Sequence, residues 1–196
     1  MKKQVMTLMC VITSVCSVVV QASTSLLPGT TVIVPGTTLG TEVDLAGGVV
    51  INKLVPFKIV TSSGKLLFRG NLQNRIVRSA SDGNLHFYYA IRDTEAGLPG
   101  KILALTTESF RTTPVISTNY RVDGFGMVAP QTASRSYNGA QVMFRFSHRG
   151  PGMFDAGENS KFFVIKTEAK HYNEFGYTRI TLRSGQSVLL KTAQPL

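Results

Sequence analysis

Apolar and polar residues alternate over several short segments of the chain, as they do in β-strands with one face on a core. The clearest example is residues 85–92, where every second side chain is large and apolar. In residues 142–147, Phe144 and Phe146 lie on one side of the predicted strand and Arg145 on the other. Residues 162–167 are almost all apolar or β-branched, which is typical of a more central strand. We therefore expect the phenylalanines of these strands to form a core rather than a carbohydrate-binding platform.

Turn-forming residues separate these segments and indicate the fold class. Asn138-Gly139 precedes one predicted strand, and residues 183–186 separate two others in a pattern typical of a β-hairpin. Residues 167–175 are the one segment predicted to form a short helical turn. Many short strands broken by glycine and proline predict an all-β protein, a single antiparallel β-sandwich of the immunoglobulin-like or jelly-roll-like kind. The remaining strands are expected at residues 49–51, 57–60, 65–69, 74–78, 102–106, 117–122, 177–182 and 187–192.

The first 22 residues have the features of a secretory signal peptide. Lys2 and Lys3 precede an apolar run over residues 5–20, and this run is interrupted by hydroxyl side chains and shorter than the roughly 20 strongly apolar residues that span a bilayer. We expect cleavage between Ala22 and Ser23. The protein is then secreted or periplasmic, with no membrane span after signal removal.

Residues 23–40 are rich in proline, glycine and threonine. The sequence Pro-Gly-Thr-Thr occurs twice, at residues 28–31 and 35–38, and such residues favour turns or extended chain. We expect a loosely ordered N-terminal arm here, followed by the β-sandwich domain over residues 41–196.

Cysteine content and charge limit the possible partners. Cys10 and Cys16 both lie in the predicted signal peptide, so the mature chain has no disulfide and no cysteine metal ligand. Removal of Lys2 and Lys3 lowers the formal net charge from +10 to +8. A basic exported protein attracts polyanions, and anionic polysaccharide, lipopolysaccharide or the envelope surface fits an exported protein better than nucleic acid does. The charge has a simpler explanation as well, because it keeps a secreted domain soluble.

The sequence contains no motif that indicates catalysis or metal binding. The three histidines lack the spacing of zinc ligands, and we expect His86 to lie on the exposed side of its strand. Residues 155–160 hold two acids in a glycine-containing loop, which we interpret as a turn rather than a calcium site. We predict a non-enzymatic protein with no cofactor. A hydrolase whose two carboxylates come from distant strands remains the alternative, because such a pair leaves no local motif.

Four basic residues form the candidate binding surface. If Phe144 and Phe146 face the core then Arg145 faces outward, and similar alternation exposes Lys166, Arg179 and Arg183. Side chains on neighbouring strands lie about 5 Å apart, so these four residues are predicted to form one anion-binding strip. The alternative is a set of scattered charges that protect strand edges from aggregation.

Several segments resemble a known family in order along the chain, over roughly residues 74–192. They are Asp82–Tyr89, Tyr120–Gly124, Ala133–Ser136 and Ser160–Ala169. With these strand and turn patterns the chain is similar to a family of exported bacterial β-proteins that often carry a C-terminal Pro-Glu-Pro sorting tag, the PEP-CTERM signal, associated with exopolysaccharide-producing bacteria. The sequence ends at residues 191–196 without that tag. The resemblance implies an exported β-protein of no defined activity, which we expect to be an envelope, matrix or adhesion-type binding module released into the periplasm or medium.

Overall fold

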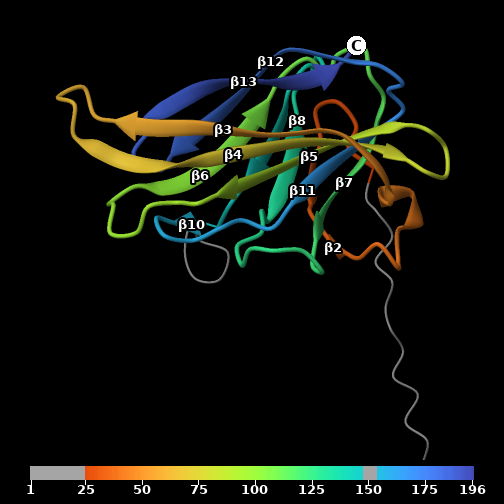
Figure 1. Ribbon diagram of the computed structural model, residues 1–196. Coiled ribbons are helices and arrows are strands. Elements are labelled where there is room, and N and C mark those ends of the chain that lie inside the picture. Colours follow the sequence, from red (N-terminus) through yellow and green to blue (C-terminus); the bar gives the residue numbers. More distant parts are fainter. Residues whose placement is uncertain (1–24, 148–153) are drawn as a thin grey trace, which may run out of the picture.

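The computed structural model of the protein describes residues 25–147 and 154–196, which form two β-sheets packed face to face (Figure 1). The predicted signal peptide with its cleavage site at Ala22 and Ser23 lies outside the described residues, as do His148 and Arg149. The all-β sandwich predicted from the sequence is confirmed. One 3-10 turn, η1 (Val43–Leu45), is the only helical element within the described residues.

The first sheet has seven strands and the second has six. In spatial order the seven-stranded sheet contains β1 (Thr31–Ile33), β8 (Thr132–Arg135), β9 (Val142–Arg145), β6 (Lys101–Thr107), β12 (Tyr172–Leu182) and β13 (Ser187–Pro195), with β10 (Phe154–Asp155) also paired to β6. The six-stranded sheet contains β2 (Gly36–Thr37), β7 (Val115–Arg121), β11 (Phe163–Thr167), β5 (Leu85–Arg92), β4 (Leu66–Ser79) and β3 (Gly47–Val60).

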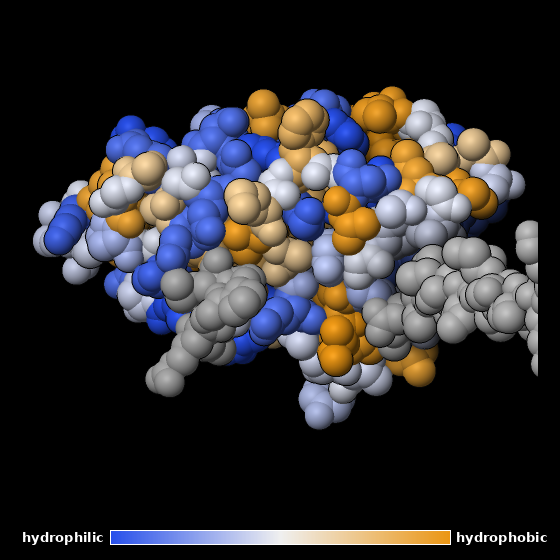
Figure 2. Space-filling view, turned by 90° about the horizontal axis from the view of Figure 1, so that it is seen from below, coloured by the Kyte–Doolittle hydropathy of each residue, from blue (hydrophilic) through white to orange (hydrophobic). Residues whose placement is uncertain are grey.

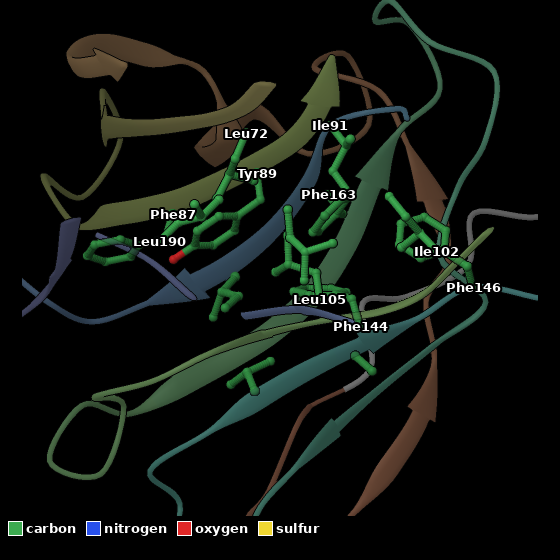
Figure 3. Close-up of a cluster of buried hydrophobic side chains, with 14 of the residues drawn as sticks. Leu72, Phe87, Tyr89, Ile91, Ile102, Leu105, Phe144, Phe146, Phe163 and Leu190 are labelled. Carbon is green, nitrogen blue, oxygen red and sulfur yellow. The ribbon is translucent and has the colours of Figure 1, made fainter. Parts of the chain in front are cut away.

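The core lies between the two sheets and is centred on Phe163 of β11 (Figure 3). The Phe163 ring centroid is 4.7 Å from that of Phe144, 6.0 Å from that of Phe146 and 6.2 Å from that of Tyr89. All four side chains are buried. Strand alternation explains this packing, because Tyr89 and Phe163 are register partners in one sheet and Phe144 projects from the other. The core positions predicted from the alternation are confirmed.

The structure differs from the predicted elements in three places. Residues 23–40 are not a loose arm throughout, because β1 pairs with β8 and β2 with β7, and the side chains of Leu26 and Val34 are buried in the core. The β2–β7 pair is parallel, whereas the other strand pairs of the described sheets are antiparallel. Residues 167–175 form no helical turn, since β12 already begins at Tyr172. Here the hydrogen bonds of the sheet satisfy the backbone that a helical turn would have used.

The six-stranded sheet is covered on both faces in its middle. Its outer face carries a second apolar cluster made of Leu45, Val77, Tyr88, Ala90, Phe162 and Val164. Leu45 belongs to η1, and the segment containing η1 lies on the sheet, since the Tyr88 hydroxyl donates to the Leu45 carbonyl at 3.0 Å and the Ala80 amide donates to the Ala46 carbonyl at 3.0 Å. The segment between β2 and β3, residues 38–46, therefore covers part of the outer face. We call this segment the cover.

Candidate functional site: an arginine-lined groove

A groove of about 680 Å³ lies on the outer face of the six-stranded sheet, next to this cover; we call it the outer groove. Tyr88 and Phe162 line it from the sheet, Leu45 from the cover, and Phe125 from the loop that follows β7. Arg75 and Arg121 supply its positive charge. Strand register brings these residues together, because Arg75 of β4 pairs with Tyr88 of β5, and the Arg121 amide donates to the Phe162 carbonyl at 2.7 Å.

Arg75 is held in place without a carboxylate partner. Its Nε donates to Asn52 Oδ1 at 3.1 Å, and its guanidinium carbon lies 4.6 Å from the centroid of the Phe162 ring. Among the ion pairs of residues 25–147 and 154–196, none includes Arg75. Burial lowers the pKa of Arg75, and the nearby charge of Arg121 lowers it further. An arginine nevertheless stays protonated, so the groove contains an oriented cation whose terminal nitrogens form no ion pair with any carboxylate among the described residues.

Arg92 places a second cation against the same ring. Its guanidinium carbon lies 4.7 Å from the Phe162 centroid, and its Nε donates to Gln73 Oε1 at 3.2 Å. Burial lowers the pKa of Arg92, and the charge of Arg75 adds to this effect. Two arginines therefore contact one aromatic ring, and the charge of Arg75 disfavours that of Arg92. A bound anion would relieve this repulsion.

Asp123 is the one carboxylate among the described residues that lines the outer groove. It is already engaged, because Arg121 Nε donates to Asp123 Oδ1 at 2.6 Å and the Leu39 amide donates to Oδ2 at 3.2 Å. The hydrogen bond from Arg121 is the main reason that the pKa of Asp123 lies below its usual range. Asp123 therefore ties the loop after β7 to the cover and neutralises Arg121, while the charge of Arg75 stays uncompensated.

A partly buried polar cluster fastens the cover to the sheet next to the groove. Lys166 Nζ lies 2.5 Å from Asp44 Oδ2 and 3.2 Å from Glu42 Oε2, and Asn119 Nδ2 donates to Glu42 Oε1 at 2.6 Å. Burial alone would lower the pKa of Lys166, but the hydrogen bond to Asp44 and the charge of Glu42 outweigh burial and raise it. The cover thus depends on one lysine that holds two carboxylates.

The expected exposure of Lys166 and His86 is wrong. Lys166 is 6% exposed and His86 is fully buried, because both project from the outer face of the sheet into the space beneath the cover. The Thr167 amide donates to His86 Nδ1 at 3.4 Å, and burial is the main cause that lowers the pKa of this imidazole. Alternation placed both side chains on the correct face of their strands, but it could not show that a segment distant in sequence covers that face.

The predicted basic strip is divided between the two sheets. Arg145 of β9 and Arg179 of β12 project from the same face of the seven-stranded sheet, since their partners on β6 are Ala104 and Thr106. Arg183 follows β12 and donates through Nη2 to the Ser147 carbonyl. Lys166 lies in the other sheet. The four residues therefore do not form one surface, although Arg145 and Arg179 lie on the same face of one sheet.

The loop that begins at Asp155 has the contacts of a structural turn. Lys101 Nζ donates to Asp155 Oδ1 at 2.8 Å, the Asp155 amide donates to Glu158 Oε2 at 2.7 Å, and Gly157 has a φ of 95°. Within the described residues no group of three or more His, Cys, Asp or Glu side chains is arranged to hold a metal ion.

Sequence reasoning missed the residues of the outer groove. Arg75 was visible as a polar position in a predicted strand, but its relation to Tyr88 and Phe162 depends on the pairing of β4, β5 and β11. The only signal available was the mixture of arginines and aromatic side chains on the outward positions of neighbouring strands. Without strand order these residues could not be assembled into a site.

Together the fold and the groove define an all-β sandwich with an arginine-lined groove on one outer face. No protein-family model matches the chain, and no curated protein or solved structure shows a significant match to it. No helix within the described ranges is long and apolar enough to cross a membrane.

Proposed function

We propose that the protein is an exported, non-enzymatic binding module of the envelope or extracellular matrix, and that its outer groove holds an anionic group of the ligand. The observation that carries this proposal is Arg75, a half-buried cation in a groove, oriented by Asn52 and Phe162 and paired with no carboxylate of residues 25–147 and 154–196. Export through residues 1–22 is part of the same proposal and rests on the sequence alone.

The groove provides the interactions that an anionic ligand needs. A guanidinium fixed through Nε presents its remaining N–H groups in a planar fork, which matches a carboxylate, sulfate or phosphate. Tyr88, Phe162 and Phe125 give the groove aromatic surface for the uncharged part of the ligand. Anionic polysaccharides and lipopolysaccharide combine such charged and uncharged parts, and both occur outside bacterial cells.

The contents of the groove favour binding over hydrolysis. A two-carboxylate glycosidase needs one acid and one base or nucleophile on either side of the scissile bond. Of the carboxylates in the part of the chain that the structure describes, only Asp123 lines the outer groove, and Arg121 and the Leu39 amide already occupy its oxygens. An engaged carboxylate with a lowered pKa is poorly suited to act as a general acid.

Replacing Arg75 with glutamine is expected to weaken binding of a heparin oligosaccharide by at least about tenfold, because hydrogen bonds to charged groups contribute about 1.5–3 kcal/mol. The matched control is Arg179→Gln, which removes the same charge from the exposed face of the other sheet. The measurement is a binding isotherm at low and at physiological salt for the protein and both variants.

The control is expected to bind nearly as well as the unchanged protein. Equal losses for Arg75→Gln and Arg179→Gln would contradict the proposal, because they would show that only overall charge matters. Release of reducing sugar ends from the oligosaccharide by the purified protein would contradict the non-enzymatic part.

A further inference from the structure

The segment Val122–Met127, which we call the apolar loop, exposes large apolar side chains beside the outer groove. Phe125 and Met127 are each 86% exposed. Phe125 lines the outer groove, and Met127 lines a neighbouring groove of about 600 Å³ together with Ile33 and Lys161. The apolar loop therefore separates two grooves that both contain basic side chains.

The base of the apolar loop is fixed rather than frayed. The amides of Met127 and Val128 both donate to the Asn159 carbonyl, at 2.9 and 3.3 Å. Gly126 has a φ of +93°, and a Cβ atom at this position would lie 2.0 Å from the Ser160 carbonyl oxygen, so the backbone packs against residue 160. On the other side, Asp123 accepts from Arg121 and from the Leu39 amide. These contacts hold the apolar loop in a conformation that keeps Phe125 and Met127 exposed.

Other apolar and basic groups extend this surface. Leu39 borders the outer groove and is 37% exposed, and Ile33 is 77% exposed next to Met127. Figure 1 places β2 and the end of β7 at the bottom of the molecule, and Figure 2, which looks at that side, shows hydrophobic groups separated by hydrophilic ones. Lys161 lies next to the apolar loop, and its Nζ donates to the Val122 carbonyl at 3.5 Å.

From this arrangement we propose that the protein docks on a bilayer that contains anionic phospholipid. The apolar loop inserts Phe125 and Met127 among the lipids, and the outer groove receives a phosphate headgroup at Arg75. This inference rests on the proposed function, since it assigns the anion of the groove to a lipid. Exposed apolar side chains next to uncompensated cations match the apolar boundary and the negative surface of such a bilayer. A sugar chain would leave Met127 and Ile33 in water.

A tryptophan placed at the tip of the apolar loop tests insertion directly, because the chain contains no tryptophan. The fluorescence of Phe125→Trp is expected to shift to the blue when phosphatidylcholine vesicles containing phosphatidylglycerol are added. Pure phosphatidylcholine vesicles are expected to cause no shift. The control is Phe175→Trp, because Phe175 is 80% exposed on β12 near the C-terminal residue, where the Leu196 amide donates to the His171 carbonyl. An unshifted Phe125→Trp, or an equal shift for both variants, would overturn the proposal.

Vesicle sedimentation separates this inference from the proposed function. Met127→Ser combined with Ile33→Ser is expected to reduce binding to the anionic vesicles by roughly tenfold or more, because two apolar side chains that meet the bilayer are lost. Heparin binding is expected to stay unchanged, because neither residue lines the outer groove. Loss of heparin binding in this variant would place the apolar loop in a sugar site and overturn docking on a bilayer. If Arg75→Gln weakens heparin binding but not vesicle binding, the lipid inference alone fails. If it weakens neither, the proposed function fails as well.

Discussion

Replacing Lys166 with alanine is expected to lower the free energy of unfolding by about 3 kcal/mol. Breaking a buried ion pair by removing one partner typically costs about 3–5 kcal/mol, because the remaining charge stays buried without compensation. In this protein Glu42 and Asp44 both lose their cation, and their side chains are only 16% and 30% exposed. Since Asp44 keeps some contact with water, we expect the lower end of that range. Urea unfolding of the protein and the variant measures the difference.

A neutral version of the same cluster distinguishes lost charge compensation from lost packing. Lys166→Met combined with Glu42→Gln and Asp44→Asn removes all three charges together and is expected to recover most of the stability, because no charge is then left without compensation in the cluster. The control Lys53→Ala breaks the Lys53–Glu174 pair, which is about half exposed, and should cost less than about 1 kcal/mol. If Lys166→Ala were as mild as Lys53→Ala, the cover would not depend on this cluster.

Phe163→Ala is expected to lower the free energy of unfolding by about 3–5 kcal/mol, the range found for buried phenylalanines truncated in cores. Phe163 is fully buried and packs against the rings of Tyr89, Phe144 and Phe146, so its removal opens a cavity between the sheets. Thermal unfolding followed by circular dichroism gives the change. Phe175→Ala serves as a control for the loss of a phenyl ring, because Phe175 is 80% exposed and its truncation should change stability by less than about 0.5 kcal/mol. A comparable loss for both variants would contradict this view of the core.

The fold class and much of the core could be predicted because they depend on period-two alternation, which a single strand contains in itself. Residues 85–92 are an example, since Phe87 and Tyr89 are buried as expected. The extent of some strands could not be predicted. Residues 49–51 and 57–60 belong to one strand, β3, because pairing with β4 continues through residues without a clear alternation, including Pro56. Cross-strand hydrogen bonds overrode the weak local pattern there.

The outer groove could not be predicted from the sequence for a different reason. Whether an outward position is exposed depends on what covers the sheet, and the cover comes from residues about 40 positions earlier than β5. His86 and Lys166 are therefore buried, although the sequence indicated surface positions for both. Tyr88 lines the outer groove for the same reason. Arg75 becomes a candidate ligand-binding residue only when β4, β5 and β11 are placed side by side.

The most direct test of the central claim is a nuclear magnetic resonance titration of the arginine Nε–H groups with a heparin disaccharide. The Nε–H of Arg75 is hydrogen-bonded to Asn52 and that of Arg121 to Asp123, which should slow their exchange with water enough for detection. We predict saturable shifts for Arg75 and Arg121 and none for Arg179, which lies on the exposed face of the other sheet. Uniform small shifts at all exposed arginines, or no shift at Arg75, would contradict an anion site in the outer groove.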